Sequence, residues 1–188
     1  SAMAQLQKKG LTPCPEIMVP LVTVVEELKY VRSMCEEVIA EVEKEYDVKL
    51  EIPIGTMIEL PRAAVTADEI GKYADFFSFG TNDLTQTTFG FSRDDVEAKF
   101  IPKYLDEHIL TRNPFETVDK NGVAALVRMG CEGGRKANPD IQLGVCGEHG
   151  GDPESIHTFN EIGLTYVSCS PYRVPIARLA AARAALDK

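Results

Sequence analysis

Short apolar runs alternate with longer amphipathic segments along the whole chain. Apolar runs closed by proline or glycine are typical of buried strands, and we expect five of them at residues 17–19, 50–58, 76–79, 141–146 and 166–169. Apolar positions at helical spacing predict helices at residues 24–45, from 66 with Thr66 as the capping residue, at 123–136, from 153 and from 174. Residues 81–118 show no clear period. The alternation of strands with helices predicts βα units and a parallel sheet.

The positions that directly follow the strands carry polar and glycine-rich residues. They are Glu59, the segment 80–83 and the segment 146–149, whereas the strands themselves are apolar on both faces, as buried parallel strands are. In a (β/α)8 barrel such positions form the active-site rim, and a whole barrel needs eight strands in about 250 residues. Five strands in 188 residues therefore predict an α/β fold that is a partial (β/α)8 barrel. An open doubly wound sheet is compatible with the same count.

Composition narrows the class of protein. With 44% hydrophobic and 26% charged residues, the chain is expected to form one globular domain. The net charge of −9 argues against a nucleic-acid partner. To bind an anionic ligand, the protein would need a metal ion, helix N-termini or arginines that make the local electrostatic potential positive. No apolar stretch approaches the ~20 residues of a membrane span, so no membrane partner is expected.

Five cysteines without a Cys-x-x-Cys pair argue against a disulfide framework. We therefore expect an intracellular, reducing compartment, which would be the cytoplasm, or a plastid or glycosome if the protein is targeted there. Residues 1–12 are interpreted as a leader that begins with the remnant of a cleaved tag, and residues 13–188 as a single domain.

Two carboxylates stand at successive strand ends, Glu59 and Asp83. Because neighbouring parallel strands bring their carboxyl ends together, both side chains should lie on the same rim. Paired carboxylates suit Mg²⁺, which prefers oxygen ligands and shares its coordination sphere with waters and substrate. The alternative is that Asp83 caps the helix that follows it. Thr81 and Asn82, beside it, could bind a substrate carboxylate or orient a water on the metal, or could form an ordinary turn.

Cys146 ends a strand and is followed by glycines, where backbone can approach a small ligand. Its thiol could exchange protons, act as a nucleophile, ligate a metal or be a buried hydrophobe. We expect the last role for the other cysteines, Cys14, Cys35, Cys131 and Cys169. His149 is expected to order the loop by hydrogen bonding rather than to act as a base. Two arginines follow strands and could meet an anion, although surface ion pairs are the expected role: Arg62 and Arg173.

Four segments together resemble the pyruvate, phosphate dikinase branch of the PEP-utilising enzyme family. They are GTMIELPRAA (55–64), FFSFGTNDLTQTTFG (76–90), CGEHGG (146–151) and SCSPYRVP (168–175), in family order across nearly the whole chain. Phosphoenolpyruvate synthase and enzyme I of the sugar phosphotransferase system share shorter versions of these motifs. The CGEHGG form and the run FGFSRDD (89–95) favour the dikinase branch.

The resemblance implies a function. Family members convert ATP, pyruvate and phosphate reversibly into AMP, phosphoenolpyruvate (PEP) and diphosphate, with the phosphoryl group carried by a phosphohistidine on another domain. It implies that Glu59 and Asp83 hold Mg²⁺, that Thr81, Asn82 and Asp83 bind the substrate, and that Cys146 exchanges a proton at the methyl carbon. It also implies a homodimer that assembles through this domain.

The resemblance covers strands 4–8 of the family's barrel. The family's substrate-binding arginines lie on the first three strands, so we expect this chain alone to be inactive. Two other classes stay open here: a non-catalytic dimerisation module, and a cysteine hydrolase that uses Cys146 and His149. The second would leave Glu59 and Asp83 without a role.

Overall fold

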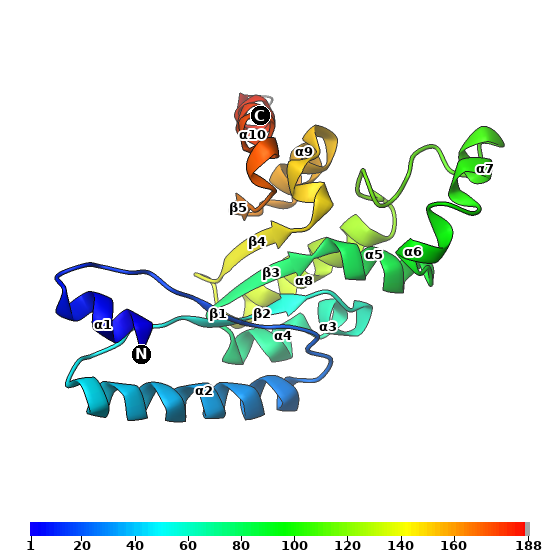
Figure 1. Cartoon of the computed structure of the whole chain (residues 1–188). Coiled ribbons are helices and arrows are strands. Elements are labelled where there is room, and N and C mark those ends of the chain that lie inside the picture. The colour runs from blue at the N-terminus through cyan, green and yellow to red at the C-terminus, as the bar shows by residue number, and fades with distance from the viewer. Residues whose placement is uncertain (187–188) are drawn as a thin grey trace.

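The computed structural model of the protein describes residues 1–186, and over this range the strands form one five-stranded parallel sheet in the order β1-β2-β3-β4-β5 (Figure 1). The order of strands in the sheet is their order in the sequence, so each crossover joins neighbours, as in a barrel. The strands are β1 (Ile17–Val19), β2 (Ile54–Ile58), β3 (Phe76–Gly80), β4 (Gln142–Cys146) and β5 (Tyr166–Val167).

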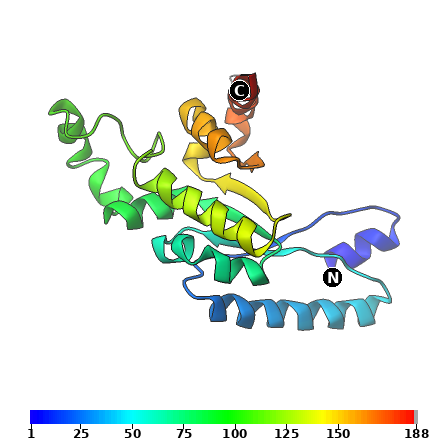
Figure 2. The same cartoon turned by 180° about the vertical axis from the view of Figure 1, so that it is seen from behind.

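One helix precedes β1, and helices follow every strand. They are α1 (Ala2–Lys8), α2 (Val25–Tyr46), α3 (Pro61–Val65), α4 (Ala67–Ile70), α5 (Thr81–Phe89), α6 (Arg93–Val96), α7 (Ile101–Asp106), α8 (Val123–Ala137), α9 (Pro153–Ile162) and α10 (Val174–Leu186), with single 3-10 turns η1 (Gly71–Tyr73), η2 (Glu148–Gly151) and η3 (Pro171–Arg173). The long helix α2 and, behind the sheet, α4 and α8 cover one face (Figures 1 and 2).

The main core lies between that face and its helices. Phe77 and Phe79 of β3 are fully buried there, together with Leu28 of α2, Ile70 of α4 and Val127 of α8. Because side chains alternate along a strand, the residues between them point to the opposite face. That opposite face, here called the inner face, carries Met18, Met57, Ser78, Gly144, Cys146 and Tyr166.

The inner face differs from the sequence expectation that the strands are buried on both sides. Met18 and Tyr166 are 39% and 37% exposed, because no helix in residues 1–186 lies over them. Its residues are also less apolar than those of the covered face, with a hydroxyl, a thiol and a phenol among them.

A segment of residues 91–117, here called the arm, extends from the carboxyl end of the sheet and contains α6 and α7 (Figure 1). It has a small apolar cluster of its own, formed by buried Val96, Ile101 and Phe115 with aromatic residues packed around them. The absence of a clear period predicted irregular structure for residues 81–118, whereas the structure has three helices there, α5, α6 and α7.

Most other predicted elements are confirmed; β1 has the predicted bounds, β3 is one residue longer, and β2, β4 and β5 are shorter. Strand β2 begins at Ile54 rather than at residue 50, because Pro53 has no N–H to donate to a neighbouring strand. Thr66 occupies the N-cap position of α4, as predicted, but its side chain makes no capping hydrogen bond, because its hydroxyl donates backwards to the carbonyl oxygen of Arg62 at 2.9 Å. Helix α1 occupies part of the predicted leader, and residues 187 and 188 of the predicted domain lie outside the described range.

Among residues 1–186, no helix has the length and apolar character needed to cross a membrane.

Candidate functional site

The predicted rim residues converge at one end of the sheet. Glu59 directly follows β2, Thr81 is the first residue of α5 after β3, and Cys146 is the last residue of β4. The parallel register pairs Ile58 with Phe79 and Gly80 with Cys146, so these chain positions lie side by side at the carboxyl ends of the strands. This is the end at which active sites of βα barrels form.

Glu59 is a buried carboxylate with one fixed hydrogen bond. Its side chain is 3% exposed, and its Oε1 accepts a hydrogen bond from the backbone N–H of Leu21 at 2.7 Å. A Cβ atom at Gly80 would stand 2.7 Å from Oε2, so the glycine makes room for the carboxylate. Burial raises the pKa of Glu59 above its ordinary value, and the charge of Asp83 raises it further.

Asp83 lies in the first turn of α5 and is not its cap, because the residue before the helix is Gly80. The alternative role as a helix cap is therefore wrong. Its Oδ1 accepts from Gln86 Nε2 at 3.1 Å, and its side chain comes within hydrogen-bonding reach of Glu59.

The donor set of Glu59 and Asp83 fits a hard divalent ion. Two carboxylates in contact repel each other, as the pKa of Glu59 records, and a cation between them would relieve that repulsion. Magnesium usually takes one or two carboxylates and keeps waters and substrate oxygens in its other positions. Within residues 1–186, no group of three or more histidine, cysteine or carboxylate side chains is arranged to hold a metal ion.

Cys146 lies beside these carboxylates, and its thiol is protonated at neutral pH. Its Sγ lies 3.7 Å from the carbonyl oxygen of Phe79. Burial raises the pKa of the Cys146 thiol, and the charges of Glu59 and Asp83 raise it further, against a lowering hydrogen bond from Ser78. A thiol that keeps its proton at neutral pH suits proton donation better than nucleophilic attack.

Ser78 and Tyr166 are neighbours of Cys146 that the sequence analysis missed. The Ser78 hydroxyl lies near both the thiol and the Tyr166 phenol and lowers the pKa of each, although burial and nearby negative charge raise the pKa of Tyr166 on balance. The signal that could have found them is the period of two along the strands, which places both residues on the inner face with Cys146.

Thr81 and Asn82 both contact the loop that follows β4. Thr81 is fully buried, and its hydroxyl lies 2.8 Å from His149 Nδ1 and 3.1 Å from the carbonyl oxygen of Cys146. The Asn82 Oδ1 accepts from the backbone N–H of Glu148 at 3.2 Å, which leaves the Nδ2 amide as the donating end of that side chain. Both residues therefore tie the start of α5 to the loop after β4.

His149 orders this loop, as the sequence analysis predicted. It is fully buried, with Nδ1 beside the Thr81 hydroxyl and Nε2 2.9 Å from the carbonyl oxygen of Pro114. Burial lowers the pKa of His149, so the ring is neutral at pH 7. With both nitrogens engaged and the Cys146 thiol protonated, the hydrolase alternative has no activated nucleophile.

The remaining cysteines only partly match the expected buried role. Cys131 is fully buried, and burial raises its pKa to about 12, which makes it an inert core residue. Cys35 and Cys169 are partly buried against apolar clusters. Cys14 is exposed, so that prediction is wrong; its thiol donates only weakly to Thr12 O at 3.8 Å.

In this structure both arginines bond to groups of the protein itself. Arg173 pairs with Glu148 at 3.3 Å on the surface, as expected. Arg62 instead donates from Nη1 to the carbonyl oxygen of Thr23 at 2.6 Å and so joins α3 to the segment before α2. Both contacts are structural.

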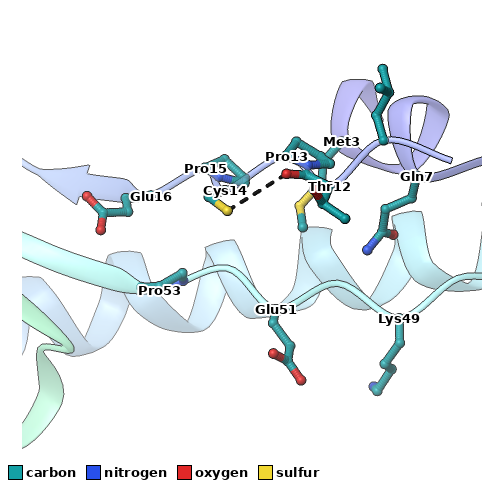
Figure 3. Close-up of a pocket in the computed structure, with 11 residues that line it drawn as sticks. Met3, Gln7, Thr12, Pro13, Cys14, Pro15, Glu16, Lys49, Glu51 and Pro53 are labelled. Atoms are coloured by element: carbon teal, nitrogen blue, oxygen red, sulfur yellow. Dashed lines mark hydrogen bonds between the residues drawn. The ribbon is translucent and has the colours of Figure 1, made fainter. Parts of the chain in front are cut away.

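A hollow of about 510 Å³ lies at the opposite end of the sheet, between α1 and the segment before β2 (Figure 3). Its polar side chains do not converge: Lys49 and Glu51 point away from Cys14, whose thiol turns to its own loop. The hollow is remote from Glu59, Asp83 and Cys146 and has no arrangement for catalysis.

Comparison with known proteins agrees with this geometry. Residues 2–186 match the family model described as PEP-utilising enzyme, PEP-binding domain. The chain is 57% identical over 182 residues to a chloroplastic pyruvate, phosphate dikinase of Flaveria bidentis, covering 97% of this chain and 19% of that protein. It is 52% identical over 187 residues to the pyruvate, phosphate dikinase of Clostridium symbiosum, covering 100% of this chain and 21% of that protein. The chain thus spans about a fifth of the length of the curated relatives it matches.

A solved structure supports the fold. A citrate lyase from Burkholderia xenovorans LB400 superposes with a TM-score of 0.58 at 14% identity, over 90% of this chain and 49% of that one. Together with the parallel sheet in sequential order, this likeness confirms the predicted partial βα barrel. The matched family model and the dikinase relatives lead to one conclusion: the chain belongs to the PEP-utilising enzymes and lies within their PEP-binding domain.

Proposed function

We propose that this chain is the PEP/pyruvate-binding part of a pyruvate, phosphate dikinase, a phosphotransferase that converts ATP, pyruvate and phosphate into AMP, PEP and diphosphate. The observation that carries the proposal is the convergence of Glu59, Asp83 and Cys146 at the carboxyl end of the sheet, where burial and the neighbouring carboxylates raise the pKa of Glu59 and of Cys146. An enolate formed from pyruvate needs both a positive charge at its oxygen and a proton carrier at its carbon.

Glu59 and Asp83 would hold Mg²⁺, which when bound supplies positive charge against the developing enolate oxygen. The Asn82 amide would donate a hydrogen bond to the substrate. Thr81 is buried, so its contribution would come from the backbone N–H at the start of α5 rather than from its hydroxyl.

Cys146 would carry the proton. In the direction of pyruvate formation, the Sγ–H bond breaks, the proton goes to the methylene carbon of the enolate, and a thiolate remains. In the other direction the thiolate takes a methyl proton from pyruvate, and the enolate oxygen then accepts the phosphoryl group. The raised pKa of the thiol supports this role, because the thiolate is then a base strong enough to recover a proton.

The phosphoryl group would arrive from a phosphohistidine on another domain of the whole protein, and the chain alone would not complete the reaction. We also propose that the domain forms a homodimer. Light scattering tests this directly: a dimer mass is expected, and a monomer mass at all concentrations contradicts it.

Calorimetric titration of oxalate, a planar mimic of the enolate, tests the function. We expect binding that requires Mg²⁺ and is lost in Asp83→Asn, which keeps the acceptor for Gln86 but removes the charge. The matched control is Asp95→Asn, the same change at a surface carboxylate paired with Lys99 in the arm, and it should bind as the wild type does. Binding that is equal with and without Mg²⁺, or no binding to the folded wild type, contradicts the proposal.

A further inference from the structure

His149 connects the candidate site to the arm. Its imidazole is fully buried, with Nδ1 2.8 Å from the Thr81 hydroxyl at the start of α5 and Nε2 2.9 Å from the carbonyl oxygen of Pro114 in the arm. The proposed function assigns no role to this side chain, although Thr81 is followed directly by Asn82 and Asp83.

The partners determine where the ring carries its proton. The carbonyl oxygen of Pro114 can only accept, so Nε2 must be protonated. Burial keeps the ring neutral against the raising effects of the Pro114 hydrogen bond and of Asp152 and Glu148, and Arg93 acts in the same sense as burial. A neutral imidazole has one N–H, so Nδ1 is an acceptor.

The Thr81 hydroxyl has a single proton and two acceptors within reach. One is His149 Nδ1 at 2.8 Å, and the other is the carbonyl oxygen of Cys146 at 3.1 Å. With an acceptor at Nδ1, the hydroxyl donates to His149 over the shorter distance. Without that acceptor, it would turn to the end of β4.

We propose that His149 is a positioning residue: as the Nε2–H tautomer it holds the Thr81 hydroxyl and thereby fixes the first turn of α5, which presents Asn82 and Asp83. This inference rests on the proposed function, because those two residues are the ones assigned to substrate and metal. His149 itself touches neither reacting group, and it acts through Thr81.

Two substitutions test the His149–Thr81 and His149–Pro114 hydrogen bonds separately. His149→Asn places an oxygen near the position of Nδ1 and keeps the acceptor for Thr81, but it loses the donor to Pro114. His149→Gln reaches Pro114 with its amide N–H but offers nothing to Thr81. We expect Mg²⁺-dependent oxalate binding to weaken about tenfold in His149→Gln and to stay within about threefold of wild type in His149→Asn.

A double-variant comparison tests whether the effect passes through Thr81. Thr81→Val removes the hydroxyl at nearly constant volume, and it should weaken oxalate binding about as much as His149→Gln does. The double variant should then lose no more than either single variant. Fully additive losses, or equal losses in the asparagine and glutamine variants, would overturn the positioning role.

A ligand-free measurement separates this inference from the proposed function. Imidazole ¹⁵N resonances of the wild-type chain at pH 7.5 should show a protonated Nε2 and an accepting Nδ1, and Thr81→Val should shift only the Nδ1 resonance. A protonated Nδ1, or an Nδ1 resonance that Thr81→Val leaves unchanged, refutes the link whether or not oxalate binds. If the spectra are as expected but oxalate does not bind, the proposed function is refuted instead. His149 would then hold Thr81 without positioning any substrate ligand.

Discussion

Glu59 shows how one residue serves both structure and chemistry. Its Oε1 anchors the backbone of Leu21, which has a positive φ of 54°, while its other oxygen faces the space left by Gly80. Burial and the neighbouring Asp83 raise its pKa, so in the absence of a cation the ionised side chain is a cost to the fold.

Glu59→Gln is expected to raise the unfolding midpoint of the metal-free protein at pH 7. An acid whose pKa is raised on folding stabilises the protein below its unfolded pKa, near 4.5, and loses that contribution as the pH rises through the folded value. The amide cannot ionise and still accepts from Leu21. The gain over wild type should therefore vanish below pH 4.5, as thermal unfolding across pH would record.

Glu59→Ala is the matched control for that experiment. It also removes the charge, but it leaves the Leu21 N–H without its acceptor, which costs ~1–3 kcal/mol. The alanine variant should thus be less stable than the glutamine variant at every pH. Equal stability of the two would show that the Leu21 hydrogen bond has no energetic weight.

At the scale of elements, the loop between β4 and η2 depends on one backbone conformation. Gly147 has φ of 101°, and a Cβ atom there would stand 2.8 Å from Asn82 Oδ1 and 3.3 Å from Thr81 Oγ1. Only glycine allows both the turn and this approach. The loop and the start of α5 are therefore fitted to each other.

Gly147→Ala is expected to destabilise the protein by ~1–3 kcal/mol and to weaken Mg²⁺-dependent oxalate binding, because strain and displacement of Asn82 add together. Gly90→Ala provides the control. Gly90 also has a positive φ, 68°, at the end of α5, but a Cβ atom there meets nothing within 4 Å. This control should lose stability through strain alone and keep its oxalate affinity.

The elements differ in how well the sequence predicted them. Helices α2 and α8 and strands β1 and β3 follow clear periods in the sequence, so the order of βα units was predictable. Strand β5 was predicted at twice its length, because apolar residues outside a strand, such as Cys169, also pack against apolar clusters. Threonine commonly caps helices, yet the Thr66 hydroxyl donates to the preceding turn. Which of these two hydrogen bonds forms depends on local geometry rather than on residue type.

The sequence also predicted the positions of the candidate site better than the contacts within it. Glu59, Asp83 and Cys146 were predictable because each stands at a strand end, where topology alone brings residues together. Ser78 and the contacts of His149 depend on packing across the sheet and between α5 and the arm. No pattern along the chain encodes contacts between residues as distant as Thr81 and His149.

At the scale of the whole molecule, residues 1–186 contain three separate apolar clusters of unequal size, the third of which joins α9 to α10. The main core joins the sheet to α2, α4 and α8, whereas the arm is stabilised by the small cluster around Phe115. Elements with few buried contacts open locally at lower free energy than the main core. The arm should therefore open without unfolding the sheet.

Phe115→Ala tests this independence. We expect faster amide hydrogen exchange in α6 and α7, with little change in β3 and α8. Truncating a buried phenylalanine costs ~3–5 kcal/mol, and Phe115 belongs to the cluster that stabilises the arm rather than to the main core. The control Phe159→Ala makes the same change in the main core and should speed exchange throughout the sheet. Uniform acceleration in both variants would indicate a single cooperative unit.

For this chain taken by itself, the exposed inner face determines which side chains are open to oxidation. Its accessible side chains include the thioethers of Met18 and Met57 and the thiol of Cys146, so sulfur atoms gather where solvent reaches the sheet. Peroxide would convert the methionines into polar sulfoxides and the cysteine, through its small thiolate fraction, into a sulfenic acid. Ageing in air would thus alter the chemical identity of this surface while the covered face, with its phenylalanines, stayed intact.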